Sequence, residues 1–136
     1  MRHTIKTFLI AASAALILLV FASCGSTIEF PKSSVVPAAK IEVKAETDSY
    51  DNNVFTFKVE HLANAERLSP PKSVYIAWAE TEDNGVINLG KLKTEAGDKA
   101  ELRTSTPFNV TEIFITAENE ALLKVPAGIE IGRVSL

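Results

Sequence analysis

The side chain best suited to covalent chemistry in this sequence of 136 residues is the thiol of Cys24, its only cysteine. A thiolate forms readily and is the strongest nucleophile that a protein offers for accepting an alkyl group. The small side chains of Ala22 and Ser23 leave the backbone just before Cys24 open to a peptidase. A single cysteine also excludes an internal disulfide bond and a zinc site built from several cysteines. Cys24 is therefore the first candidate for modification.

Histidine contributes little to a catalytic or metal-binding site. The chain has two histidines, of which His3 lies in an N-terminal segment that we expect to be removed. His61 lies before a loop, without the sequence signature of a hydrolase nucleophile, and we interpret it as a surface residue. One histidine and one modified cysteine supply too few nitrogen or sulfur ligands for a transition metal, so we expect neither a metal site nor a cofactor.

Carboxylates near two predicted turns are candidates for acid–base chemistry. Glu80, Glu82 and Asp83 precede one turn, and Glu118 and Glu120 lie near another. Two carboxylates held at the right separation can hydrolyse a glycosidic bond. Charges beside turns are more often a solvated rim that prevents edge-to-edge pairing of sheets. We therefore predict that the protein is not an enzyme and keep a carboxylate-dependent hydrolase as the least favoured alternative.

Aromatic side chains are candidates for a binding surface. Tyr50, Tyr75 and Phe108 could lie near loops and stack against sugars or peptides, although aromatic residues at strand spacing are usually buried. The formal net charge is −3, and no basic stripe is interleaved with the aromatic residues. We therefore expect no nucleic-acid partner.

The first 23 residues have the order of a secretory signal peptide. Residues 1–7 carry Arg2 and Lys6 and no acidic residue, and residues 8–23 are uncharged and mostly apolar. A membrane-spanning helix needs about 20 apolar residues, and this run is shorter. No basic cluster follows it. We predict that residues 1–23 are a cleaved signal peptide.

The segment Phe21-Ala22-Ser23-Cys24-Gly25 resembles a bacterial lipobox, in which small residues precede a lipid-accepting cysteine. It departs from the usual pattern at Phe21, where leucine is common. The resemblance implies that the mature chain begins at a Cys24 carrying diacylglyceryl and palmitate, so that the membrane is a partner. Two or three acyl chains hold firmly, because each buried methylene contributes about 0.8 kcal/mol. No acidic residue directly follows Cys24, which by resemblance to known sorting signals implies the outer membrane, with the domain facing the periplasm.

The next stretch, residues 26–39, has two predicted roles. It contains prolines and shows no periodicity, and an extended proline-rich segment of this length reaches roughly 40 Å. Alternatively, Ile28 or the pair Val35-Val36 packs onto the domain as an edge strand. We divide the mature chain into a lipidated N-terminus and flexible tether, residues 24–39, and a folded domain, residues 40–136.

From residue 40 onward, apolar and polar residues alternate with the period of two that is typical of half-buried strands. We expect about seven strands, near residues 40–46, 55–62, 74–79, 87–92, 100–104, 113–117 and 129–134. A single helical turn is expected near residues 63–67. Asn84-Gly85 predicts a type I′ hairpin turn, because both residues tolerate a positive φ.

This pattern predicts an all-β fold, a two-sheet β-sandwich of the immunoglobulin-like kind. The strand around Trp78 is apolar on both faces, which is typical of a central strand. We expect Trp78 to plug the core of the sandwich, and Phe57, Ile76 and Ile115 to be structural core residues as well.

Short motifs support an extracytoplasmic location. They occur in the order Tyr75-x-x-Trp78, Leu89-Gly90, Ile115-Thr116-Ala117-Glu118 and Pro126-x-Gly128. The mature domain thereby resembles the extracytoplasmic domain of anti-sigma-K-type factors, and residues 30–39 resemble uncharacterised lipoproteins of the Bacteroidetes group. The first resemblance implies a β-sandwich outside the cytoplasm and supplies no catalytic residue. A cytoplasmic sigma-binding domain does not precede the apolar run, so we do not expect transcriptional control.

Together these observations predict a lipid-anchored lipoprotein of the cell envelope that acts as a non-enzymatic binding or structural module. Its expected partner is an envelope protein or a glycan. The alternative is a regulator or inhibitor of an envelope enzyme that acts through a loop or a sheet edge.

Overall fold

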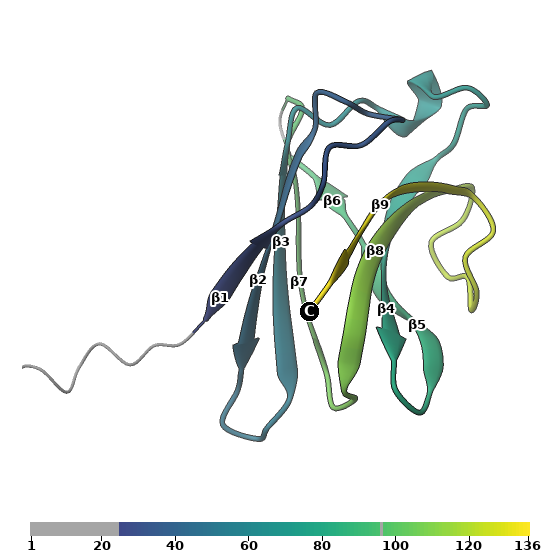
Figure 1. Cartoon of the computed structure of the whole chain (residues 1–136). Coiled ribbons are helices and arrows are strands. Elements are labelled where there is room, and N and C mark those ends of the chain that lie inside the picture. The colour runs from purple at the N-terminus through teal and green to yellow at the C-terminus, as the bar shows by residue number, and fades with distance from the viewer. Residues whose placement is uncertain (1–24, 96) are drawn as a thin grey trace, which may run out of the picture.

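The alternating residues form two antiparallel sheets that pack face to face in a computed structural model, which describes residues 25–95 and 97–136 (Figure 1). The first sheet has the strand order β1-β2-β3-β7-β6 and the second has the order β5-β4-β8-β9. The elements are β1 (Ser26–Glu29), β2 (Lys40–Thr47), β3 (Asn53–Glu60), η1 (Ala65–Arg67), β4 (Val74–Thr81), β5 (Gly85–Lys91), β6 (Lys93–Thr94), β7 (Ala100–Thr106), β8 (Val110–Glu118) and β9 (Ile129–Ser135). The all-β, two-sheet prediction is confirmed. A search of the described residues for a helix of membrane-spanning length and hydropathy found none.

The described residues form nine strands where about seven were predicted, because the short edge strands β1 and β6 were not among the predicted seven. One of them, β6, follows directly after the strand predicted near residues 87–92. The chain changes sheets at this point: β5 pairs with β4 in the second sheet, and β6 pairs with β7 in the first. Gly90 has a φ of +131°, a backbone conformation that favours glycine, just before the chain changes sheets.

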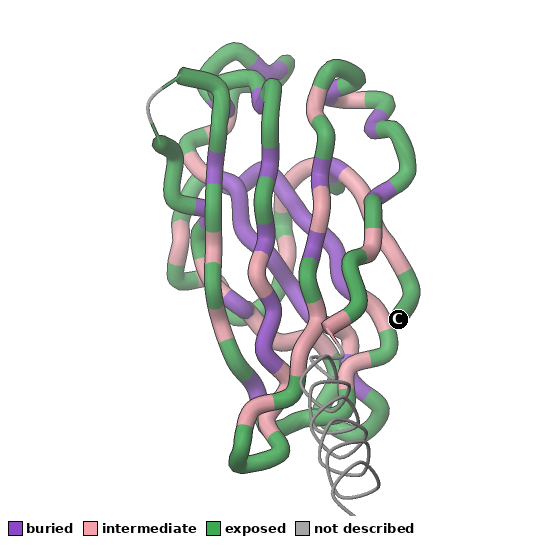
Figure 2. Tube along the Cα trace, turned by 90° about the vertical axis from the view of Figure 1, so that its left-hand side faces the viewer, coloured by how far each residue is buried: buried purple, intermediate pink, exposed green. Residues whose placement is uncertain are grey.

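The core between the sheets is built from the inward face of each strand. The first sheet contributes Ile41, Val43, Phe55, Phe57, Val59 and Ala100, and the second contributes Tyr75, Ala77, Ala79, Ile113, Ile115, Ala117 and Ile131. The predictions for Phe57 and Ile115 are confirmed. Figure 2 shows buried and exposed residues alternating along the strands of the first sheet, and longer buried runs in the sheet behind it. The second sheet therefore has a cover on its outer face as well.

That cover buries Ile76 and Trp78, two of the predicted core residues, and corrects the position expected for Trp78. Both side chains are buried, but they lie outside the inter-sheet core, in a separate cluster with Phe114 on the outer face of the second sheet. The Trp78 and Phe114 rings stack with centroids 6.3 Å apart. Leu123 of the loop between β8 and β9 packs against them. The small alanines that alternate with Trp78 along β4 face the inside instead, so the two apolar faces of the strand belong to two different cores.

The predicted tether is part of the folded domain. Residues 26–29 form β1, which pairs antiparallel with β2 from Ser26 opposite Ala45 onward. Phe30 and Val36 are buried in the inter-sheet core. Ser33 holds the intervening turn, because its hydroxyl accepts hydrogen bonds from two backbone N–H groups. The folded domain therefore begins at residue 26 rather than residue 40, and the edge-strand alternative is correct.

The hairpin predicted at Asn84-Gly85 is present, but its turn type is different. Thr81 pairs with Gly85, so three residues lie in the loop, and Gly85 alone of the predicted pair has a positive φ, +65°. A three-residue loop followed by a glycine of this conformation differs from a type I′ turn, which has two loop residues that both take a positive φ. The Thr81 hydroxyl supports the turn by accepting from Asn84 N and donating to Gly85 O.

Candidate functional site

The residues of the predicted lipidation site, Phe21, Ala22, Ser23 and Cys24, lie outside the described residues, and lipidation at Cys24 stays a prediction. Gly25, the next residue, is described. Its backbone packs closely against two side chains of β2: a Cβ on Gly25 would lie 2.9 Å from Lys44 Cε and 3.0 Å from Glu46 Cγ. The folded part of the chain therefore reaches the residue bonded to Cys24.

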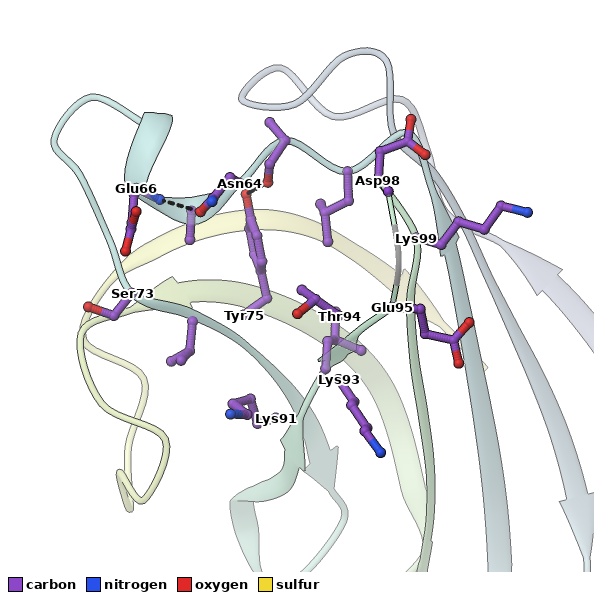
Figure 3. A pocket seen from close by; sticks show the side chains of 16 residues that line it. Asn64, Glu66, Ser73, Tyr75, Lys91, Lys93, Thr94, Glu95, Asp98 and Lys99 are labelled. Atoms are coloured by element: carbon purple, nitrogen blue, oxygen red, sulfur yellow. Dashed lines mark hydrogen bonds between the residues drawn. The ribbon is translucent and has the colours of Figure 1, made fainter.

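A cavity of about 430 Å³ opens where the loop containing η1 faces β6 and the turn between β6 and β7 (Figure 3). This end of the sandwich is remote from the start of β1, because Ser26 pairs near the end of β2 whereas Lys40, at its beginning, pairs with Glu60 just before the cavity loop. The cavity has the size of a small-molecule site. Its sequence signal was weak, because it is assembled from three separate segments.

The chemistry of the cavity suits hydrogen bonding rather than aromatic stacking. Tyr75 lies at its base but is only 3% exposed, and its hydroxyl donates to Ala63 O at 2.7 Å (Figure 3). Burial raises the pKa of this hydroxyl above its ordinary value. The charged residues that line the cavity are Lys91, Lys93, Lys99, Glu66, Glu95 and Asp98. Their charges balance, so the rim favours a polar ligand of mixed character, and Tyr75 is not available for stacking.

His61 lies beside this cavity and is exposed, as predicted. It has a φ of +56°, and its Nδ1 lies 2.8 Å from Asp98 Oδ2. The hydrogen bond with His61 is the main cause that lowers the pKa of Asp98 below its ordinary value. Both side chains are more than half exposed, so this pair joins two loops at the surface.

Glu118 is the candidate carboxylate whose prediction is wrong. It is 2% exposed and belongs to no solvated rim, whereas Glu82, Asp83 and Glu120 are exposed as predicted. A chain of hydrogen bonds surrounds it. Trp78 Nε1 donates to Thr116 Oγ1 at 2.8 Å, this hydroxyl donates to Glu118 Oε1 at 2.7 Å, and the same oxygen accepts from Ala127 N at 3.0 Å. The carboxylate thus attaches the loop between β8 and β9 to the sheet that this loop covers.

Three other carboxylates of the outer face surround Arg133. Its Nη1 lies 2.6 Å from Glu112 and 3.0 Å from Glu80, and its Nη2 lies 3.1 Å from Glu130. The guanidinium carbon lies 4.1 Å from the centre of the Phe114 ring, a cation–π contact. The hydrogen bonds that Arg133 donates to Glu130 and Glu112 raise the pKa of Arg133, and the bond from Arg133 is the main cause that lowers the pKa of Glu112.

Replacing Arg133 with methionine is expected to raise the pKa of Glu112 toward its ordinary value. The folded pKa of Glu112 is lowered, so its contribution to stability is present above the unfolded-state pKa and is lost as pH falls through the folded pKa. The variant should lose that part of the acid dependence of unfolding. Carboxyl-resolved NMR titration measures the change, and Asp48, whose pKa is lowered mainly by a side-chain hydrogen bond from Asn52, is the control. An unchanged pKa at Glu112 contradicts the assignment.

Exposed apolar side chains mark two further places. Leu122 is 94% exposed and Val125 is 66% exposed in the loop between β8 and β9. Asn88 Nδ2 holds that loop through Ala121 O and Leu123 O, at 3.0 and 2.9 Å. Sequence reasoning missed Leu122 and Val125, because nothing local distinguishes an apolar loop residue that packs inward from one that faces solvent.

The second place is at the end of the sandwich where β1 begins. Tyr50, between β2 and β3, is 85% exposed, and Phe108, between β7 and β8, is 38% exposed. These are two of the three aromatic residues considered for binding; the third, Tyr75, is buried.

Comparison with protein-family models, with curated proteins and with solved structures found no match to this chain. The resemblances to anti-sigma-K-type domains and to Bacteroidetes lipoproteins therefore stay predictions. The described residues contain no group of three or more histidine, cysteine, aspartate or glutamate side chains placed to hold a metal ion.

Proposed function

We propose that this chain is a lipoprotein anchored in the cell envelope through Cys24, and that its sandwich is a non-enzymatic binding or structural module. The observation that carries the proposal is the position of the first strand. β1 starts at Ser26, two residues after Cys24, so a lipid on that thiol leaves every described strand intact. The basic and then apolar order of residues 1–23 supports export. Anchorage in the outer membrane, facing the periplasm, belongs to the same proposal.

The strand order supports an immunoglobulin-like classification of the sandwich. β2, β3 and β7 are neighbours in one sheet, and β5, β4, β8 and β9 are neighbours in the other. The chain passes between sheets from β3 to β4, from β5 to β6 and from β7 to β8, which are crossings of the kind that Greek-key sandwiches use. In this classification β1 and β6 are additions to the edges.

The environments of the ionisable groups support a non-enzymatic role. Glu118 is occupied by hydrogen bonds that attach a loop, and Glu80 and Glu112 are paired with Arg133. His61 is exposed and paired with Asp98. A carboxylate-dependent hydrolase needs two carboxyl groups free to reach one substrate, and these pairs make it the least supported alternative.

The cavity beside η1 is the ligand site that the binding proposal favours. It lies at the end of the sandwich away from Ser26, so an anchored domain presents it to the periplasmic space. Balanced charges and hydrogen-bonding groups on its rim suit a polar segment of an envelope protein or a glycan.

A regulator or inhibitor of an envelope enzyme is the second candidate, and Leu122 favours it. An apolar side chain that is 94% exposed, on a loop held in place by Glu118 and Asn88, is apolar surface whose burial under a protein partner would be favourable. This candidate requires a protein partner that covers the loop, whereas the first requires a ligand in the cavity.

Replacing Cys24 with alanine is expected to abolish incorporation of radiolabelled palmitate and to move the protein from the membrane fraction to the soluble fraction. Alanine has no thiol, so no thioether to the lipid can form. Ser23→Ala is the matched control, because it keeps a small residue before the cysteine and should leave labelling unchanged. A Cys24→Ala protein that is still labelled with palmitate contradicts the proposal.

A further inference from the structure

We infer that the sandwich stands directly on the bilayer that holds its anchor, with the end that carries Tyr50 and Phe108 in the headgroup region. This inference rests on the proposed lipid at Cys24. It goes beyond that proposal, because an anchored domain on a long tether would have no preferred face. The surface that this end contacts is a zwitterionic phospholipid membrane.

The link between lipid and fold is too short to let the domain move away. Gly25 already packs across the side chains of Lys44 and Glu46, and Ser26 is paired with Ala45. Consecutive Cα atoms are about 3.8 Å apart, so the two residue steps between the lipid-bearing position and the first residue of β1 span at most roughly 8 Å of chain. The end of the sandwich where β1 begins is therefore held at the membrane surface.

Three loops form that end, and hydrogen bonds join them into one surface. They connect β2 to β3, β4 to β5 and β7 to β8, and Figure 1 shows them together at the end where β1 begins. Asn53 Nδ2 donates to Phe108 O at 2.9 Å, and Glu82 N donates to Asn109 O at 3.2 Å. These bonds fix the loops relative to one another, so that Phe108 is displayed from a supported backbone.

The backbone around Tyr50 is held equally well. The carboxylate of Asp48 accepts from Tyr50 N at 2.8 Å and from Asn52 N at 3.0 Å. Asp51 completes the tight turn with a φ of +62°. Tyr50 is consequently displayed from an ordered loop, and its insertion costs little additional backbone entropy.

The two exposed aromatic residues suit a headgroup environment. All other aromatic side chains among the described residues are buried, yet Tyr50 is 85% exposed and Phe108 is 38% exposed. Tyrosine in particular is favoured at membrane interfaces, where its ring is half in the apolar layer and its hydroxyl stays hydrated.

The charge of these loops selects the lipid. Asp51, Glu82 and Asp83 are exposed at this end. Anionic headgroups would repel them over the Debye length, about 8 Å at physiological ionic strength. A zwitterionic phosphatidylcholine or phosphatidylethanolamine surface carries no such net charge, so it is the surface that these loops can approach.

A fluorescent reporter on the hairpin loop tests the orientation. Lipidation blocks the thiol of Cys24, so Asp83→Cys provides one reactive thiol for an environment-sensitive dye. The lipidated full chain is reconstituted in phosphatidylcholine liposomes that contain a nitroxide lipid. Glu66→Cys, at the opposite end beside η1, is the matched control. We expect severalfold stronger nitroxide quenching at position 83 than at position 66, and a reduction of that quenching when Tyr50→Ser and Phe108→Ser are added.

The outcomes separate this inference from the proposed function. Protein that does not co-float with the liposomes overturns both. Protein that co-floats but is quenched equally at positions 83 and 66 overturns only the docking inference. If the dye at position 83 is shielded from water even without lipid, and sedimentation shows dimers, a second copy of the chain covers this surface. That result also overturns the docking inference.

Discussion

Trp78→Ala is expected to lower the free energy of unfolding by about 3–5 kcal/mol, the usual cost of removing a large buried aromatic side chain. The indole is fully buried between Phe114 and the loop that connects β8 to β9. Alanine would leave a cavity there. It would also remove the indole N–H that donates a hydrogen bond to Thr116 Oγ1. Urea unfolding followed by circular dichroism measures the loss.

The position of Trp78 outside the inter-sheet core gives this prediction a second, local readout. The loop between β8 and β9 covers the indole, so hydrogen exchange in that loop should accelerate more than exchange in β2 or β3. Leu122→Ala is the control, since a 94% exposed side chain should change stability by less than about 0.5 kcal/mol. Equal acceleration in both sheets would show that Trp78 supports the central core instead.

Gly128→Ala is expected to destabilise the protein by about 3 kcal/mol, the upper end of the usual cost of overpacking. A Cβ at Gly128 would lie 1.9 Å from the carbonyl oxygen of Ala117 and 2.7 Å from Glu118 Oε2. The oxygen at 1.9 Å belongs to the backbone, so a side-chain rotation cannot relieve the contact. Either the start of β9 or the loop before it must move away from β8, and this displaces the Ala127 N–H from Glu118.

Gly132→Ala is the matched control for this substitution within β9. The nearest atom to its Cβ would be Phe30 Cδ1 at 3.2 Å, the edge of a ring that can shift slightly. We expect its thermal midpoint to remain much closer to that of the unmodified protein. A Gly128→Ala protein as stable as Gly132→Ala would mean that the loop has another arrangement.

The all-β class and most strand positions could be predicted because alternation is a local property. A residue two positions from another faces the same side of its sheet, whatever the sheet later packs against. Phe57 and Ile115 could be assigned to the structural core for this reason, since each shares a face with other apolar residues on its strand. The hairpin at Gly85 is equally local, although its turn type depended on how the strands pair.

The candidate sites were predicted less completely, because burial depends on segments far apart in the chain. Glu118 looked like a solvated carboxylate beside a turn, and only the return of Ala127 over the sheet buries it. The cavity beside η1 joins three segments that have no common sequence signature. Leu122 is exposed because its neighbours Ala121 and Leu123 are the residues that the loop turns inward.

Neighbouring residues alone are enough to specify local features: a thiol after an apolar run, strands with two kinds of face, and turns rich in glycine and asparagine. Tertiary structure decided which apolar face of β4 is inside, because both faces are apolar and only packing partners distinguish them. It also decided that residues 26–39 belong to the domain, since pairing with β2 and burial of Phe30 and Val36 outweigh the freedom of an extended chain.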